Sequence, residues 1–217
     1  ARSLVMRMFA ALVGVVVGVS VAITSAAASY TEGKDYVVLA ERVVPADPKK
    51  VEVAEFFSYA CPHCSKFEPI LQAWAKKLPA DVSLVQTHVS FNRPDWAGYQ
   101  RGYYTLLSLG MKDKVQEAVF NSIYIANKHL SGAQDWADFL SLYGVDKQKV
   151  LSTYNSFGVN SQIKQAEART RDFKVPSTPM VIVDGRFRVA VANHEEMVKV
   201  AQFLVDKVRA ERGAVKP

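Results

Sequence analysis

The residues of this chain best suited to chemistry are two cysteines separated by a Pro-His pair, in the segment Cys61-Pro62-His63-Cys64. Two thiols at this spacing, on the first turn of a helix, lie on one face and close enough to form a disulfide. The pair therefore indicates dithiol/disulfide redox chemistry. Cys61 would stand at the helix N-terminus, where unpaired backbone N–H groups and the helix dipole stabilise an anion. We expect its pKa to be lowered and its thiolate to be the reactive form.

The other residues of the segment suit supporting roles. Cys64 would lie one turn inside the helix, so we expect it to be more buried and to resolve a mixed disulfide. Pro62 fits the first turn, because the N–H that it lacks would be unpaired there anyway. His63 adds a hydrogen-bond donor, and a positive charge when protonated, beside the Cys61 sulfur.

Three other roles for the cysteines are less consistent with the sequence than redox chemistry. A structural disulfide between residues three apart would constrain the unfolded chain very little. A metal site would need two further ligands, and the remaining histidines are scattered singly: His88, His129 and His194. Covalent haem attachment requires a histidine directly after the second cysteine, where Ser65 stands. We interpret His88 as structural, and His129 and His194 as surface or capping residues.

The cysteines follow a predicted strand and begin a predicted helix. Val51–Phe57 is rich in β-branched and aromatic residues, which favours a strand. From residue 62 to about residue 78, apolar residues recur every three or four positions, which predicts a helix. Residues 82–89 form the next predicted strand. This order predicts a βαβ unit with two parallel strands and the cysteines at the first strand-to-helix junction.

A block of helices is predicted next. Glycines and prolines separate five expected helices: 95–109, 113–127, 133–143, one capped by Asp146, and one capped by Asn160 that ends near residue 172. So long a stretch without a strand indicates an insertion or a subdomain.

Strand patterns return after the helical block. Asp184-Gly185 is typical of a tight hairpin turn between the predicted strands Met180–Val183 and Phe187–Val189. Residues 195–212 predict a final amphipathic helix, and residues 36–39 a short first strand.

The N-terminus has the pattern of an export signal. Arg2 and Arg7 precede an apolar stretch over residues 8–23, and Ala26 and Ala28 form a small-residue cleavage site. We therefore expect residues 1–28 to be a cleavable signal peptide. The alternative is an uncleaved anchor, for which the apolar stretch is a little short. Either way the remainder would lie outside the cytoplasm, where disulfides persist.

Composition and charge exclude several classes of protein. Hydrophobic residues make up 49% of the chain and charged residues 22%, which excludes wholesale disorder. Without Arg2 and Arg7, 25 basic residues remain against 21 acidic ones, and they are spread along the chain. Nucleic-acid binding would need these basic residues to form a cluster or a stripe. We therefore expect the protein not to bind nucleic acid. The sequence has no glycine-rich nucleotide loop and no metal cluster, so we expect no cofactor beyond the redox-active disulfide Cys61–Cys64.

The segment Glu55–Cys64, together with Val175–Met180, resembles the DsbA family of periplasmic thiol:disulfide oxidoreductases, and the resemblance covers essentially the whole mature chain. Pro-His between the cysteines is usual in that family, whereas thioredoxins usually carry Gly-Pro. The resemblance implies an α/β protein: a thioredoxin fold with an inserted all-helical domain. Residues 29–93 and 172–217 would form the thioredoxin-like domain, and residues 94–171 the inserted helical domain.

The resemblance also implies roles for residues outside the cysteine segment. Thr178–Pro179 would be a cis peptide that faces the disulfide and binds an extended substrate backbone; from the sequence alone, Pro176 is a rival for the cis bond. Glu55 aligns with a buried acid that would relay protons to or from Cys64, the alternative being a surface glutamate on an edge strand. Gln86 stands where some members carry a lysine that pairs with this acid.

The function that the resemblance implies is a thiol:disulfide oxidase. It would donate the Cys61–Cys64 disulfide to reduced or unfolded exported polypeptides in the periplasm, through a mixed disulfide at Cys61. A DsbB-type, quinone-linked membrane oxidase would reoxidise it. We expect a monomer. Dimeric bacterial isomerases carry a separate N-terminal dimerisation domain, for which about 20 residues before the first core strand leave no room. The alternatives are a disulfide isomerase or reductase and, less favoured, a non-enzymatic metal-binding or chaperone module.

Overall fold

The computed structural model describes residues 29–214. The predicted signal peptide, its cleavage point and the alternative of an uncleaved anchor all lie outside these described residues. Within residues 29–214, no helix is long and apolar enough to cross a membrane.

A five-stranded sheet with the order β1-β5-β4-β2-β3 forms the centre of one half of the molecule. The strands are β1 (Tyr36–Val38), β2 (Val51–Phe57), β3 (Val82–His88), β4 (Met180–Val183) and β5 (Phe187–Val189). β2 and β3 run parallel, as the predicted βαβ unit requires, and the other neighbouring pairs are antiparallel. β2 lies between β3 and β4, and all seven of its residues are buried.

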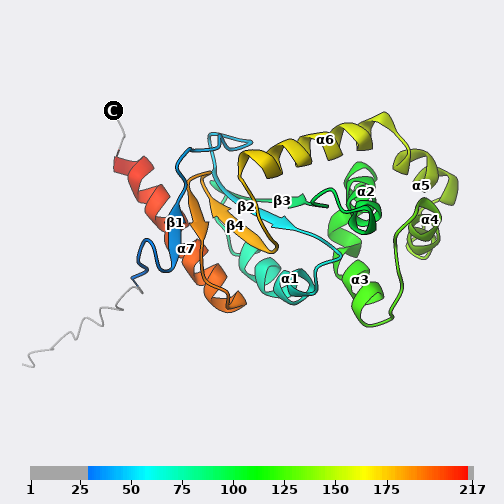
Figure 1. Cartoon of the computed structure of the whole chain (residues 1–217), viewed down its shortest axis with the longest axis horizontal. Coiled ribbons are helices and arrows are strands. Elements are labelled where there is room, and N and C mark those ends of the chain that lie inside the picture. The colour runs from blue at the N-terminus through cyan, green and yellow to red at the C-terminus, as the bar shows by residue number, and fades with distance from the viewer. Residues whose placement is uncertain (1–28, 215–217) are drawn as a thin grey trace, which may run out of the picture.

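The two faces of the sheet are covered by different helices (Figure 1). α1 (Pro62–Ala75) and α7 (His194–Ala214) pack together against one face, where Phe67, Leu71 and Leu204 contribute to the core. The C-terminal end of α6 (Phe157–Asp172) lies over the other face, where Phe173 packs with Phe56 and Ile182. Burial on both faces explains why β4 is a continuous apolar run.

The other half of the molecule is helical and has its own core (Figure 1). It contains α2 (Pro94–Ser108), α3 (Lys112–Tyr124), α4 (Ala133–Ser141) and α5 (Lys147–Tyr154). The fully buried Trp136 lies in this core, and so do Phe57, Cys61 and Cys64. The cysteines therefore lie where the helical core meets the end of β2.

The predicted start of α6 is wrong. Asn160 does not cap this helix; Ser156 does, because its Oγ accepts a hydrogen bond from the backbone N–H of Val159. Gly158 suggested a helix end, yet it lies within the first turn of α6. Ser156 and Asn160 are both favoured capping residues, and Ser156 stands three positions before Val159, which the structure buries. The predicted cap of α5 is confirmed, since Asp146 accepts from the backbone N–H of Lys149.

The predicted hairpin between β4 and β5 is confirmed. Asp184 and Gly185 both have positive φ, of 54° and 63°, as a type I′ turn requires. A Cβ on Gly185 would also lie 1.8 Å from the carbonyl oxygen of Val43, so only glycine fits.

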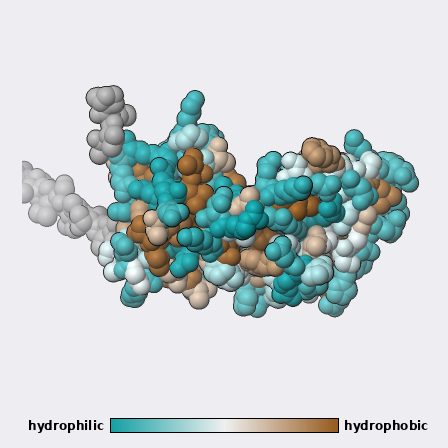
Figure 2. Space-filling view, turned by 45° about the horizontal axis from the view of Figure 1, so that its top comes forward, coloured by the Kyte–Doolittle hydropathy of each residue, from teal (hydrophilic) through white to brown (hydrophobic). Residues whose placement is uncertain are grey.

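The visible surface is mostly hydrophilic, with hydrophobic residues in several separate groups rather than one continuous patch (Figure 2). A single large apolar patch would have indicated a permanent interface, and this face of the molecule does not show one.

Candidate active site

Cys61 is the N-cap of α1 and has an extended backbone, with φ −98° and ψ 114°. Pro62 follows at the start of the helix, as predicted. Hydrogen bonds from the Cys64 thiol, from Thr178 and from the backbone N–H groups of Cys64 and His63 lower the pKa of Cys61 to about 5, against the opposing effect of burial. The predicted lowering of the pKa is thus supported by the unpaired amides of the first helical turn.

Cys64 lies one turn further into α1 and is 1% exposed. Burial, together with the nearby Cys61, raises the pKa of the Cys64 thiol far above its ordinary value. Both cysteines are free thiols in this structure, which therefore represents the reduced form. The fold therefore favours the thiolate of Cys61 and the protonated thiol of Cys64.

Cys61 is itself largely buried. Only 5% of its surface is accessible, although it remains the more accessible of the two cysteines. The cause is the loop before β4, which places the carbonyl oxygen of Thr178 3.5 Å from Cys61 Sγ.

Thr178–Pro179 is a cis peptide bond, and Pro176 is not in one. The bond lies in the loop before β4, next to the Cys61 sulfur. Pro179 and His63 both line a cavity of about 520 Å³, which we call the active-site groove. The rest of the groove comes from the same loop, the end of β5 and the start of α7.

The turn between β2 and α1 is held by buried polar contacts. The backbone N–H of Tyr59 donates to His88 Nε2 at 2.9 Å, and the Tyr59 carbonyl accepts from the Tyr124 hydroxyl at 2.9 Å. The backbone N–H of Cys61 donates to the Ser58 carbonyl at 3.0 Å. Burial lowers the pKa of His88 to about 3, so its ring is neutral and able to accept. His88 is structural, as predicted.

Glu55 is a buried acid on the interior strand β2, 1% exposed, so the alternative of an edge-strand surface glutamate is wrong. Gln86 lies directly opposite on β3 and donates from Nε2 to Glu55 Oε2 at 2.7 Å. Burial and the nearby Glu68 raise the pKa of Glu55 to about 8, despite the Gln86 hydrogen bond. Within residues 29–214, Glu55 Oε1 is buried without a hydrogen-bond partner. Glu55 is therefore protonated near neutral pH.

A second buried acid, Glu68 on α1, was missed from the sequence. Its Oε1 accepts from Gln116 at 2.6 Å and from Gln72 at 2.9 Å, and its Oε2 accepts from Gln86 at 3.1 Å. Burial raises the pKa of Glu68 as well. The signal was its position between Phe67 and Leu71, on the buried arc of the helix. Gln86 thus joins two buried carboxyl groups, with no cation in hydrogen-bond contact with either among residues 29–214.

The prediction for His194 is partly wrong. Asn193, not His194, caps α7, since its Oδ1 accepts from the backbone N–H of Glu196. The His194 ring packs 5.4 Å from the Phe67 ring and 6.3 Å from the His63 ring, centre to centre. It lines the active-site groove. The sequence could not show that His194 lies near His63, because the two residues are far apart along the chain. His129 is exposed, as predicted.

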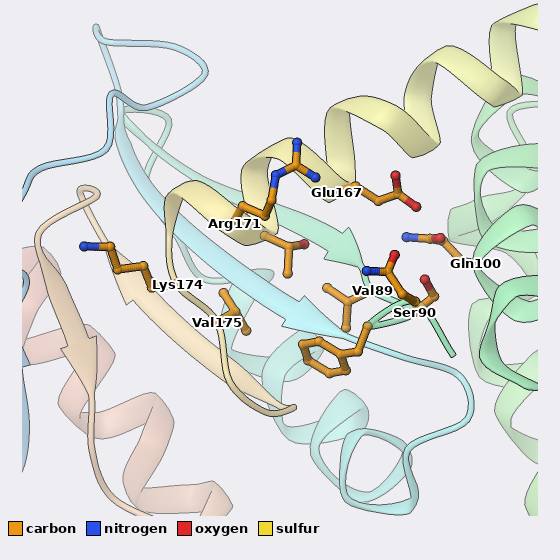
Figure 3. A pocket seen from close by; sticks show the side chains of 10 residues that line it. Val89, Ser90, Gln100, Glu167, Arg171, Lys174 and Val175 are labelled. Carbon is orange, nitrogen blue, oxygen red and sulfur yellow. The ribbon is translucent and has the colours of Figure 1, made fainter. Parts of the chain in front are cut away.

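A separate pocket of about 300 Å³ lies between α6 and the end of β3 (Figure 3). Glu167 and Arg171 reach it from α6, Gln100 from α2, and Ser90 from the turn after β3 (Figure 3). None of its lining residues is a site residue identified from the sequence. Within residues 29–214, no three His, Cys, Asp or Glu side chains lie close enough together to hold a metal ion.

Comparison with known proteins gives one consistent family. Residues 52–204 match the family described as DSBA-like thioredoxin domain. The thiol:disulfide interchange protein DsbA of Pseudomonas aeruginosa is 40% identical over 184 residues, covering 83% of this chain and 87% of that protein. The DsbA of Pseudomonas syringae is 38% identical over 194 residues, covering 88% and 90%.

Solved structures agree with this assignment. The crystal structure of Pseudomonas aeruginosa DsbA has a TM-score of 0.79 and 39% identity, covering 85% of this chain and 97% of that one. The oxidoreductase NmDsbA1 of Neisseria meningitidis has a TM-score of 0.74 and 30% identity, covering 84% and 96%. The predicted thioredoxin-like fold with inserted helices is confirmed. The chain belongs to the DsbA family and is a thiol:disulfide oxidoreductase of the disulfide-oxidase type.

Proposed function

We propose that the protein oxidises pairs of thiols in exported polypeptides by transferring the Cys61–Cys64 disulfide through a mixed disulfide at Cys61. The observation that carries the proposal is the difference between the two sulfurs. The pKa of Cys61 is lowered to about 5, whereas the pKa of Cys64 is raised by burial. Only Cys61 is a good leaving group and a reachable electrophile.

In the first step, a substrate thiolate attacks Cys61 Sγ of the oxidised protein. The Cys61–Cys64 bond breaks, a substrate–Cys61 bond forms, and Cys64 leaves as a thiolate that must take up a proton. In the second step, another substrate thiolate attacks the substrate sulfur of the mixed disulfide. Cys61 then leaves as its stabilised thiolate. Two electrons pass from the substrate dithiol to the protein, and the substrate gains a disulfide.

The direction follows from which form the fold stabilises. A thiolate that is stabilised only in the folded reduced protein makes the disulfide form a strong oxidant; this is the accepted explanation for DsbA itself. The hydrogen bonds to the Cys61 sulfur exist only in the fold, so they favour the reduced state.

The remaining site residues are assigned positioning and proton-transfer roles. Pro62 and His63 shape the first turn of α1, whose amides face the Cys61 sulfur. Thr178 and Pro179 present the backbone against which an extended substrate segment lies. Glu55, held protonated, supplies the proton that the Cys64 thiolate needs. Support for this last role comes from the pKa of Glu55, raised to about 8 by burial.

The cellular setting rests on the family and on the N-terminal sequence pattern. The protein acts in the periplasm after export by a cleavable signal peptide, on reduced or unfolded polypeptides. A DsbB-type, quinone-linked membrane oxidase removes the two electrons afterwards. The protein works as a monomer, uses its own disulfide as its redox group without a further cofactor, and binds no nucleic acid. The thioredoxin-like domain is residues 29–93 and 172–217, and the inserted helical domain is residues 94–171.

The test is the equilibrium of the Cys61–Cys64 couple with glutathione at pH 7. We expect a reduction potential well above that of thioredoxin, whose value is about −270 mV. A thioredoxin-like potential would contradict the oxidase and would favour a reductase or isomerase that another electron donor keeps reduced.

A further inference from the structure

The active-site groove begins at the reactive sulfur. Thr178, whose carbonyl oxygen is 3.5 Å from Cys61 Sγ, precedes the groove-lining Pro179. His63, two residues after Cys61, lines the groove as well. A polypeptide whose cysteine reaches Cys61 therefore places the residues next to that cysteine in or beside this groove.

The charge that lines the groove is positive. Arg188, the middle residue of β5, is the charged lining residue, and the groove is also lined by the imidazoles of His63 and His194. None of the lining residues, all of which belong to the described part of the chain, is acidic. Val189, Val191 and Met197 make much of the remaining lining apolar.

The guanidinium of Arg188 is not neutralised by a neighbour. Six other arginines form ion pairs with carboxylates, but among residues 29–214 Arg188 has no acidic partner within 4.0 Å and no hydrogen bond from its side chain. Its side chain is half-buried. A partly desolvated cation without a partner attracts an anion more strongly than a fully solvated one.

The two acids in the first turn of α7 do not line the groove. Glu196 is bound to Lys199 at 2.8 Å and to the Tyr30 hydroxyl at 3.2 Å, and it does not line the groove. Glu195 is exposed and does not line it either. The positive end of the α7 dipole lies at His194, which adds to the same sign of potential. Neutral His194 can also donate one N–H to a carboxylate.

We propose that Arg188 and His194 make the active-site groove selective for substrates with an acidic residue within about three positions of the reacting cysteine. The substrate class is an extended, reduced polypeptide segment with apolar residues and a carboxylate beside its thiol. The apolar lining of the groove accommodates the apolar residues of the substrate, and Arg188 pairs with its carboxylate. This proposal rests on the oxidase function and adds a preference among its substrates.

The test uses three synthetic peptides of the form Ala-Xaa-Val-Cys-Val-Xaa-Ala, in which Xaa is Glu, Gln or Lys. Excess peptide thiol reduces the oxidised protein: two thiols form one peptide disulfide, and the two electrons reduce Cys61–Cys64. Acid quenching and mass spectrometry give the rate. Each rate is divided by the rate of the same peptide with the neutral disulfide 2,2′-dithiodipyridine, because the flanking charge also changes the reactivity of the peptide thiol.

At pH 7 and low salt we expect the normalised rate of the Glu peptide to exceed that of the Lys peptide by about fivefold or more, with the Gln peptide between them. The ratio of the Glu-peptide rate to the Lys-peptide rate should fall towards one in about 0.5 M salt, where charges are screened over a few ångströms. Arg188→Gln should lower the ratio most, Arg188→Lys should retain much of it, and His194→Ala should lower it less than Arg188→Gln.

Matched controls separate the groove from the overall positive charge of the protein. Lys164→Gln removes one exposed cation from α6, and His129→Ala removes an exposed histidine outside the groove; both should leave the ratio unchanged. Equal rates for the three peptides, or a ratio that Arg188→Gln does not change, would overturn the proposal and leave the oxidase function intact. If the oxidised protein reacts with no peptide, it is the oxidase function that fails.

Discussion

Gln86 donates a hydrogen bond of 2.7 Å to the buried carboxyl group of Glu55. An amide satisfies one oxygen of the acid but brings no positive charge. Among residues 29–214 no cation is in hydrogen-bond contact with Glu55, and burial beside Glu68 raises its pKa to about 8. Burial and Glu68 therefore hold on Glu55 the proton that the proposed mechanism requires.

Gln86→Lys should lower the pKa of Glu55 clearly below about 8, because an opposite charge in contact favours the carboxylate. Carbon-13 NMR of the glutamate side chains across pH 4–10 measures this pKa directly. Gln165→Lys, on an exposed face of α6, is the control with the same change of charge. An unchanged Glu55 pKa in Gln86→Lys would show that Gln86 does not determine the ionisation of this acid.

Glu55→Gln should slow the step in which Cys64 becomes protonated, without unfolding the protein. The rate of disulfide transfer should also lose part of its dependence on pH between about 6 and 9, since the raised pKa of Glu55 lies in that window. Stopped-flow kinetics with a reduced peptide across this range is the measurement. Rates and a pH profile equal to those of the unmodified protein would rule out the proton relay.

Glu55→Gln should also change how stability depends on pH. The pKa of Glu55 is about 8 in the fold and about 4.3 in an unfolded chain, so the folded protein holds a proton that the unfolded chain releases. The contribution of this acid is fully favourable below about pH 4.3 and is lost as pH rises through about 8, with a limiting slope on the order of 1 kcal/mol per pH unit. Urea denaturation between pH 5 and 8 should show a smaller decline in Glu55→Gln; identical declines would contradict the buried protonated acid.

The reduced protein should melt at a higher temperature than the disulfide form at neutral pH. The pKa of Cys61 is about 5 in the fold, below the value of about 8.5 for an unfolded thiol. The gain for the reduced form is therefore complete above about pH 8.5 and disappears as pH falls through about 5. Thermal melts of both forms at pH 4, 7 and 8.5 test this; equal melting temperatures at pH 7 would count against an oxidant.

Thr178→Val should raise the pKa of Cys61, because the side chain of Thr178, and not only its carbonyl oxygen, contacts the sulfur and contributes a hydrogen bond that lowers this pKa. The replacement keeps the shape of the side chain and removes its hydroxyl. Thr153→Val, on the exposed surface of α5, should leave this pKa unchanged. If Thr178→Val also leaves it unchanged, the backbone amides of α1 and the Cys64 thiol suffice to stabilise the thiolate.

Much of the fold could be predicted from sequence because its signals are local. The segment Val51–Phe57, rich in β-branched and aromatic residues, and the Asp184-Gly185 turn determine their own conformations, and both elements are confirmed. The start of α6 was misplaced because Ser156 and Asn160 are both favoured capping residues. Only the packing of Val159 into the helical core distinguishes them.

Only those features of the cysteine site that depend on residues adjacent in sequence could be predicted. Cys61 and Cys64 are identified by their spacing at a strand-to-helix junction. Glu68 joins the site because α1 packs against α3 and β3, which bring Gln116 and Gln86 to it. His194 lies beside His63 although 131 positions separate them, because α7 packs on α1. No pattern in the linear sequence indicates those contacts.

The central claim is that the fold holds Cys61 as a thiolate, and the most direct test is the titration of its thiolate absorbance near 240 nm in the reduced protein. A Cys61→Ser variant identifies the transition that belongs to this residue. We predict a single transition with a pKa of about 5, since the pKa of Cys64 is raised by burial. A Cys61 transition near the ordinary thiol pKa of about 8.5 would contradict the stabilised thiolate and the oxidising disulfide that depends on it.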